Sequence, residues 1–235
     1  MLVSTYLAII LTTGVSHVAF IISLVSQKGG VGKSTLARLI AREAAVGGLD
    51  VKIADLDTQQ KTCTNWAARR IANNVQPEIE VQPVGDLNRA IQDASRYDLY
   101  IFDGAPHAST QTLKISKLSD LVIIPSSLTL EDRQPAVELA NDLYQEGIPA
   151  EQIAFALCLI GESKRQLQDA TDYFSKTQYQ LLKGAIPRKD SSASLLNMGR
   201  SLTEGPFKFL CERAETLAQS IIDATATAAT QEKVA

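Results

Sequence analysis

The chain is poor in several features whose abundance would point to a particular class of protein. Its 235 residues contain three cysteines, Cys63, Cys158 and Cys211, which lie far apart and form no C-x-x-C pair. An odd and widely spaced set argues against a disulfide framework and indicates reduced thiols in a cytoplasmic protein. The formal net charge is only −3. The chain as a whole is therefore not a basic nucleic-acid binder, and any DNA contact would have to come from a local patch.

Sequence repeats are also lacking, and 45% hydrophobic against 21% charged residues favours one domain with a substantial core. Residues 1–25 contain no charged residue unless His17 is protonated, which superficially suggests a signal peptide or membrane segment. However, this run lacks a basic start, Gly14 and several Ser and Thr interrupt it, and its last third is needed as a strand. We interpret residues 1–18 as an N-terminal extension of unknown role, 19–222 as a single domain, and the alanine-rich end, 223–235, as a tail that frays.

Short apolar runs alternate with segments of helical spacing along the domain. The runs YDLYIFD and SDLVIIP are hydrophobic almost throughout, which is typical of strands buried on both faces. Strands separated by helices predict right-handed crossovers and an α/β fold, with a mostly parallel twisted sheet and helices on both faces. The predicted strands are residues 19–25, 51–56, 79–84, 99–102, 121–124, 153–160 and 181–186.

The most specific motif is the glycine-rich stretch SQKGGVGKST, residues 26–35, between the first strand and a helix. Backbone amides of such a turn converge on an anion, and the positive end of the helix favours it. The glycines allow a phosphate to approach closely, Lys33 supplies charge to the β- and γ-phosphates, and the Ser34 hydroxyl is placed to ligate Mg²⁺. Gln27 occupies the first glycine of the strict G-x-x-x-x-G-K-[ST] pattern. The predicted ATP-binding residues here are Lys28, Gly29, Gly30, Val31, Gly32, Lys33, Ser34 and Thr35.

Two lysines in one such loop resemble the deviant-Walker ATPases of the ParA/MinD group, P-loop NTPases whose loop reads K-G-G-x-G-K-[ST]. Lys28 matches the additional signature lysine of that group, and Lys33 matches the ordinary one. The resemblance implies that Lys28 reaches across a dimer interface to the phosphates of the partner's ATP. ATP would then be both the substrate and the cause of dimerisation. The simpler alternative is that Lys28 is a solvated loop lysine.

Three aspartates lie at or just after the carboxyl ends of predicted strands, where α/β proteins place their ligands. The stretch ADLDTQQ resembles the family's D-x-D-P-Q motif, in which Asp57 matches the residue that orients the attacking water and Asp55 would support the metal. Thr58 replaces the usual proline, which puts the catalytic competence of this loop in question, and a helix-capping role remains open for Asp57. The stretch YDLYIFDGAP is a Walker B pattern ending in Asp103, which would hold a Mg²⁺-bound water. The resulting catalytic prediction is Lys28, Lys33 and Asp57, and the metal prediction is Ser34, Asp55 and Asp103.

Two further stretches extend the resemblance, which runs from about residue 19 to residue 217. The stretch GAIPRKD is similar to the family's I-P-x-R block, where Pro187 and Arg188 would border the adenine. The stretch TNWAARR, residues 64–70, looks like a small subgroup of partition ATPases that lack an N-terminal helix-turn-helix.

Basic residues outnumber acidic ones by six to three between residues 183 and 213, a local excess of +3. Charge counting alone leaves a DNA-binding face and an ordinary solvated surface equally open. The resemblance favours DNA, because in these partition ATPases the ATP-bound dimer holds DNA nonspecifically. We therefore hypothesise that Arg188, Lys189 and Arg200 contact DNA.

The resemblance implies a weak, Mg²⁺-dependent ATPase that forms a homodimer with ATP and positions plasmid, chromosome or protein cargo. A ParB-like or centromere-binding adaptor would stimulate it, and it would be cytoplasmic and nucleoid-associated. A MinD-like membrane switch is the alternative. It is disfavoured because residues 214–235 contain a single lysine, whereas a membrane-binding terminal helix is basic and amphipathic. A nucleotide-dependent metabolic enzyme on the same scaffold also stays open, since fold does not fix function.

Overall fold

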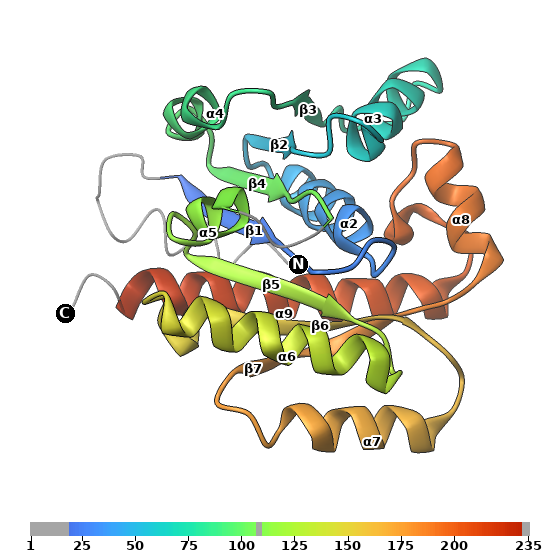
Figure 1. The fold of residues 1–235 in the computed structure, drawn as a ribbon. Coiled ribbons are helices and arrows are strands. Elements are labelled where there is room, and N and C mark those ends of the chain that lie inside the picture. Colours follow the sequence, from blue (N-terminus) through green and yellow to red (C-terminus); the bar gives the residue numbers. More distant parts are fainter. Residues whose placement is uncertain (1–18, 107–109, 232–235) are drawn as a thin grey trace.

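The computed structural model describes residues 19–106 and 110–231, so the expected N-terminal extension lies outside the described residues. The described residues form one seven-stranded sheet in the order β3-β2-β4-β1-β5-β6-β7 (Figure 1), and every strand pairing is parallel. All seven predicted strands are confirmed, with ends that move by two residues at most. They are β1 (Phe20–Leu24), β2 (Val51–Asp55), β3 (Glu80–Pro83), β4 (Leu99–Asp103), β5 (Leu121–Ser126), β6 (Ile153–Ile160) and β7 (Gln180–Pro187).

Helices cover both faces of the sheet, as predicted (Figure 1). One face packs against α2, α3 and α9, and the other packs against α4, α5, α6 and α7. The helices are α2 (Lys33–Val46), α3 (Thr62–Ala72), α4 (Leu87–Ala94), α5 (Thr110–Ser116), α6 (Leu130–Gln145), α7 (Lys164–Phe174), α8 (Asp190–Asn197) and α9 (Lys208–Gln231), with 3-10 turns η1 (Ala150–Gln152) and η2 (Leu202–Glu204).

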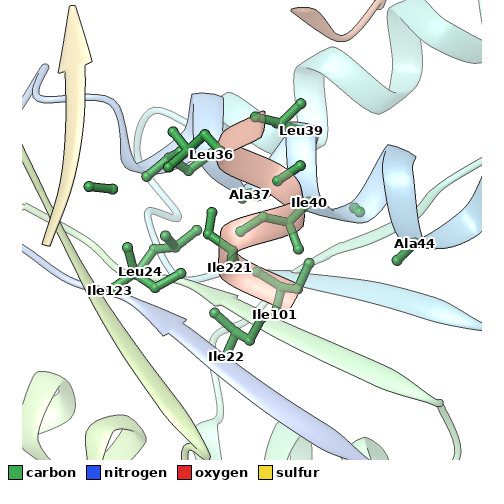
Figure 2. Packing of buried hydrophobic residues seen from close by; sticks show 14 of the residues in the cluster. Ile22, Leu24, Leu36, Ala37, Leu39, Ile40, Ala44, Ile101, Ile123 and Ile221 are labelled. Carbon is green, nitrogen blue, oxygen red and sulfur yellow. The ribbon is translucent and has the colours of Figure 1, made fainter. Parts of the chain in front are cut away.

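The central strands are buried on both faces, which explains their nearly continuous hydrophobicity. In β4, Ile101 joins the core on the α2 side while Phe102 joins the core on the opposite side. Figure 2 shows Ile101 near Ile40 of α2 and Ile221 of α9. Each aliphatic side chain that is fully buried in this way contributes roughly 1.5–3 kcal/mol. The two cores fix the sheet, and with it the strand ends that carry the functional side chains.

Strand register brings the predicted functional residues to one edge of the sheet. Asp103 at the end of β4 lies beside Asp55 of β2 on one side and Leu24 of β1 on the other. The glycine-rich loop begins directly after β1 and leads into α2. Because all three strands are parallel, both aspartates and the loop lie outside the carboxyl ends of the strands, where open α/β sheets bind ligands.

The C-terminal helix is longer than the sequence suggests. α9 continues to Gln231, so the expectation that the chain frays from Asp223 is wrong for residues 223–231. Small side chains at Ala224 and Thr225 are buried against the rest of the molecule, and alanine has the highest intrinsic helix propensity. Composition alone missed this packing. Within the described part of the chain, no helix is both long and apolar enough to cross a bilayer.

A buried ion pair attaches α3 to the segment between α8 and α9. The Arg70 guanidinium donates to both carboxylate oxygens of Glu204, at 2.7 and 2.9 Å, and Arg70 is 1% exposed. Trp66, one turn earlier, donates from its indole nitrogen to the backbone oxygen of Arg200 at 3.0 Å. Gly199 has a φ of +75°, and a Cβ there would lie 2.3 Å from the backbone nitrogen of Arg70. The TNWAARR stretch is therefore the contact surface between α3 and residues 199–204.

Removing the cation of this pair is expected to destabilise the protein strongly, because the largely buried Glu204 would keep only the Ser201 nitrogen and the longer contact with Arg42, at 3.6 Å. We predict that Arg70→Met lowers the free energy of unfolding by about 3–5 kcal/mol. The matched control is Arg69→Met, whose partly buried side chain precedes Arg70 on the same helix and should cost less than about 1 kcal/mol. Urea unfolding of both variants measures the difference. Equal losses for the two would contradict a special role for Arg70.

Candidate functional site

The glycine-rich loop presents the start of α2 to a cavity. Gly30 and Gly32 adopt left-handed backbone conformations, with φ of +76° and +113°, which glycine tolerates at no steric cost. A Cβ on Gly32 would lie 2.9 Å from the Cβ of Cys158, so no larger residue fits. α2 has no side-chain cap at its N-terminus. Its first backbone amides are therefore not bonded to a capping side chain, which leaves them available to an anion.

The cavity at this helix start has a volume of about 210 Å³. It is enclosed by the glycine-rich loop, the first turn of α2, the segment after β2 and the residues that follow β4. A larger cavity of about 890 Å³ lies between β7 and α9 and includes neither the loop nor the strand-end aspartates. The predicted site residues that line the smaller cavity are Gly29, Gly30, Gly32, Lys33, Ser34, Thr35 and Asp57.

Lys33 lies beneath the loop with its amine held in place. The amine donates to the Ser26 hydroxyl at 2.8 Å and to the backbone oxygen of Lys28 at 3.2 Å. Burial lowers the pKa of Lys33, while Asp103 and Asp57 act in the opposite direction. A cation fixed at the bottom of a nest of backbone amides suits an anionic ligand with several oxygens.

Asp103 combines a buried carboxylate with one oxygen that has no partner. The residue is 2% exposed, and among the described residues its Oδ1 accepts no hydrogen bond. Its Oδ2 lies 3.1 Å from the Cys63 sulfur. Burial raises the pKa of Asp103 to about 6, although the Ser34 hydroxyl and the Cys63 thiol oppose this shift. An orphaned carboxylate oxygen near a serine hydroxyl fits a hard cation that takes oxygen ligands.

The oxygen atoms of Ser34 and Asp103 suit Mg²⁺ better than a metal ion whose ligands all come from the protein. The described residues contain no group of three or more His, Cys, Asp or Glu that could hold a metal ion. Magnesium usually binds one or two protein oxygens, several waters and the phosphates of a nucleotide. Ser34 and Asp103 are therefore a sufficient protein contribution to such a site.

Asp55 uses its carboxylate to position the start of α3. Its Oδ2 accepts hydrogen bonds from the backbone nitrogen and the hydroxyl of Thr64, both at 2.9 Å, and its Oδ1 accepts from the nitrogen of Asp57 at 3.3 Å. Asp55 is fully buried and does not line the cavity. The geometry thus gives Asp55 a supporting position behind Asp103.

Asp57 lies at the cavity and also shapes its own loop. Its Oδ1 accepts a hydrogen bond from the nitrogen of Gln60 at 2.9 Å, and its backbone oxygen accepts from the nitrogen of Lys61 at 2.7 Å. Lys61 has a φ of +50°, so the chain turns back into α3 without the proline that usually occupies position 58. The turn-forming and cavity-facing interpretations of Asp57 are both compatible with this geometry.

Lys28 points away from the cavity and contacts the start of α6 in its own chain. Its amine lies 3.0 Å from Asp132 Oδ1 and also donates to the backbone oxygen of Glu131. Ser127 donates to the other oxygen of Asp132 at 2.6 Å. Burial opposes ionisation of Asp132, but Ser127 and Lys28 hold its pKa below the usual value. Val31 lies beside Lys28 in a small neighbouring pocket rather than in the cavity.

The I-P-R block lies at the end of β7, beside the cavity and not in its wall. The nitrogen of Arg188 donates to the oxygen of Ile160 at 2.9 Å, next to Leu159, which does line the cavity. Leu159 has a φ of +55°, and such strained backbone is concentrated at ligand sites. Pro187 is buried, whereas the Arg188 side chain is exposed.

The three DNA-contact candidates do not form one cluster. Arg188 and Lys189 precede α8 and Arg200 follows it, which separates them by roughly 12 Å at 1.5 Å per helical residue. All three side chains are exposed, and Lys189 forms an ion pair with Glu162. Any contact with DNA would therefore span both ends of α8.

Sequence reasoning missed two side chains at this site. Arg38 is 4% exposed, lines the cavity and donates to the backbone oxygen of Thr62 at 2.8 Å. Its spacing of four residues after Ser34 places both on one helical face, a signal that could have identified it. Cys63 approaches Asp103 only through the tertiary fold, and its isolated position in the sequence contains no such signal.

Comparison with known protein families agrees with this geometry. The family model for the "CobQ/CobB/MinD/ParA nucleotide binding domain" matches residues 22–206, which include the loop, the three aspartates and the I-P-R block. The chain belongs to this family. The match confirms the ParA/MinD resemblance, and a search of curated proteins finds no match.

Solved structures share the fold of this ParA/MinD family member at low sequence identity. The cell division ATPase MinD of Pyrococcus furiosus has a TM-score of 0.71 at 16% identity, with 88% of this chain and 99% of MinD covered. MinD of Pyrococcus horikoshii OT3, complexed with Mg-ADP, has a TM-score of 0.69 at 16% identity, with 87% and 96% covered. A putative plasmid partition protein of Borrelia burgdorferi B31, bound to AMPPNP, has a TM-score of 0.67 at 16% identity, with 88% and 99% covered.

The raised pKa of Asp103 predicts that the metal-free protein becomes less stable to unfolding as the pH rises. The pKa is about 6 in the folded state against an ordinary value of 3.8, so the folded state binds this proton more tightly. The stabilisation is present below about pH 4 and is lost as the pH rises through 6. Asp103→Asn cannot ionise, so its free energy of unfolding relative to wild type should rise by roughly 2 kcal/mol from about pH 4 to about pH 7.

Urea unfolding in EDTA across that pH range measures this difference. Asp142→Asn, on an exposed part of α6, is the control and should follow the wild-type curve. A constant difference between Asp103→Asn and wild type would show that Asp103 does not carry the penalty.

Proposed function

We propose that this protein is a weak Mg²⁺-dependent ATPase that dimerises with ATP, binds DNA nonspecifically and positions plasmid, chromosome or protein cargo. The observation that carries the proposal is the loop with two lysines in different positions. Lys33 is buried below the amides of the cavity, whereas Lys28 is 42% exposed in its side chain and lies outside the cavity. One lysine is thus available to the nucleotide of its own chain, and the other is accessible from outside.

Within one chain, the loop amides and Lys33 would bind the β- and γ-phosphates. Ser34 and Asp103 would hold Mg²⁺ directly or through a water, with Asp55 supporting the strand end behind them. Held by these residues, Mg²⁺ would supply positive charge that neutralises the phosphates. The Mg-ADP and AMPPNP complexes of the structurally similar proteins support this assignment.

Asp57 would orient the attacking water, since it lines the same cavity as Lys33 and Ser34. Pro187 and Arg188 would border the adenine, because β7 ends beside Leu159 at the edge of the cavity. Thr35 and Val31 complete the predicted ATP-binding set within the loop.

Lys28 would complete the site of the partner subunit. In its own chain the amine is bound to Asp132 and cannot reach a phosphate without leaving that contact. A cation that arrives only when two subunits meet would couple triphosphate binding to dimerisation and to hydrolysis.

The DNA-binding and adaptor assignments rest on the family and on charge. Arg188, Lys189 and Arg200 are exposed at the two ends of α8, and a dimer would double this surface. Similarity to a plasmid partition protein supports cargo positioning with a ParB-like or centromere-binding adaptor, at the nucleoid. The similarity to MinD supports the alternative of a MinD-like membrane switch. That alternative is disfavoured because the last turn of α9 contains no basic residue, whereas membrane-binding helices are basic and amphipathic.

The test of the two-lysine arrangement replaces the exposed cation. We expect wild type to become dimeric with ATP, and Lys28→Ala to stay monomeric and to lose at least about tenfold in ATP turnover, because a transition-state donor is removed. ATP binding by the single chain should persist through Lys33. Light scattering and phosphate release measure both effects.

The matched control is Lys61→Ala, an exposed lysine at the end of the Asp57 loop, which should dimerise and turn over ATP as wild type does. Dimerisation of Lys28→Ala at wild-type nucleotide concentrations would contradict the proposed role of Lys28.

The test of the DNA-binding surface reverses the charge of its three candidates together. We expect Arg188→Glu/Lys189→Glu/Arg200→Glu to abolish ATP-dependent co-sedimentation with plasmid DNA, because nonspecific affinity comes from phosphate contacts. The control reverses three exposed basic residues on and after α7, Lys164→Glu/Arg165→Glu/Lys176→Glu. If both triple variants retain DNA equally, the surface is wrongly assigned. Binding to anionic liposomes instead of DNA would favour the membrane alternative.

A further inference from the structure

A buried cysteine lies directly behind the proposed magnesium ligand. Cys63, in the first turn of α3, is fully buried, and its sulfur is 3.1 Å from Asp103 Oδ2 and 3.6 Å from the backbone oxygen of Ser34. Its thiol therefore contacts the Asp103 carboxylate directly and the backbone, but not the hydroxyl, of Ser34. Nothing in the family assignment or the proposed function gives Cys63 a role.

The direction of the hydrogen bond follows from the chemistry of the two groups. A carboxylate only accepts hydrogen bonds, so the thiol must be the donor when Asp103 is ionised. A free thiol is protonated at neutral pH, so Cys63 has the proton that this hydrogen bond requires.

This contact distinguishes the two oxygens of the Asp103 carboxylate. Oδ2 is occupied by the thiol, whereas Oδ1 has no partner among the described residues. A carboxylate fixed at one oxygen cannot rotate freely about its terminal bond. The remaining oxygen, Oδ1, is therefore held in one orientation and is available to a cation.

Arg38 and Asp55 hold Cys63 in position from both sides along the chain. Arg38 of α2 donates to the backbone oxygen of Thr62, directly before Cys63, at 2.8 Å. Asp55 accepts from the backbone nitrogen of Thr64, directly after it, at 2.9 Å. The backbone of Cys63 is thus fixed between α2 and the end of β2, and the thiol has little freedom to leave Asp103.

We propose that Cys63 is a positioning residue for Asp103: its thiol donates a hydrogen bond to Oδ2 and so presents Oδ1 to the magnesium of a bound nucleotide. This inference rests on the proposed function only in that the protein must bind a metal–nucleotide complex. It concerns metal affinity and makes no claim about DNA, cargo or dimerisation.

Cys158 provides a matched control in the same region. It is also fully buried, and its sulfur would lie 3.2 Å from a Cβ on Gly32 of the phosphate loop. Burial alone raises its pKa, with no carboxylate involved. Replacing Cys158 removes an equally buried thiol near the nucleotide without removing a hydrogen bond to Asp103.

The test uses Mn²⁺ as the probe, because free Mn²⁺ is counted directly by electron paramagnetic resonance. Wild type, Cys63→Ala, Cys63→Ser and Cys158→Ala are each titrated with Mn²⁺ in the presence of ADP. We expect Cys63→Ala to bind Mn²⁺ roughly threefold to tenfold more weakly, the range for a hydrogen bond from a weak donor to a charged acceptor. Cys63→Ser keeps a donor and should stay within about twofold of wild type, as should Cys158→Ala.

A second measurement separates positioning from packing. ADP affinity in EDTA should be the same for all four proteins, and adding Cys63→Ala to Asp103→Asn should cause no further loss of Mn²⁺ affinity. Wild-type Mn²⁺ affinity in Cys63→Ala, equal losses in Cys63→Ala and Cys63→Ser, or a further loss in the double variant would each overturn the inference. Failure of wild type itself to bind Mn²⁺ with ADP would instead overturn the proposed nucleotide function, and this inference with it.

Discussion

Burial of opposite charges, Lys33 at the start of α2 and Asp103 at the end of β4, is the constraint on which the site depends. Lys33 and Asp103 are both almost completely removed from solvent, and an unpaired buried charge costs several kcal/mol. The Ser26 hydroxyl, the Lys28 carbonyl and the Cys63 thiol compensate only part of that cost. The remaining deficit, visible in the raised pKa of Asp103 and in its orphaned Oδ1, would be relieved by a cation bound together with an anionic ligand. A metal–phosphate pair would therefore stabilise these incompletely compensated charges.

The supporting contacts come from segments that are distant in sequence. α3 links the end of β2, through Asp55 and Thr64, to residues 199–204, through Trp66 and Arg70. The same helix carries Cys63 against Asp103. One helix therefore contacts both the Asp57 loop and the segment that follows the I-P-R block. This arrangement gives the TNWAARR stretch a structural reason that does not depend on subgroup membership.

The sequence predicted most of the architecture because its signals were local. Seven hydrophobic runs and one glycine-rich loop between a strand and a helix suffice to place Lys33, Ser34 and Asp103, since parallel register then brings strand ends together. The features that the sequence did not predict depend on contacts that are not local. The burial of Ala224 and Thr225 in α9, the contact of Lys28 with Asp132, and the Cys63–Asp103 pair all join residues far apart in the chain. Asp55 illustrates an intermediate case: its position was predictable, whereas its use of both oxygens to hold α3 and the Asp57 loop required the tertiary structure.

The contact between Lys28 and Asp132 also bears on how a second subunit could be recruited. The Lys28 side chain is 42% exposed, and an ion pair of that exposure contributes only about 0–1 kcal/mol. In the proposed dimer, a triphosphate would offer several charged oxygens, and its attraction for the same cation would be stronger where water is excluded. Exchange of Asp132 for a phosphate would therefore be favourable once two subunits meet. It would also free Asp132, at the start of α6 and bonded to Ser127, to rearrange with the segment that follows β5.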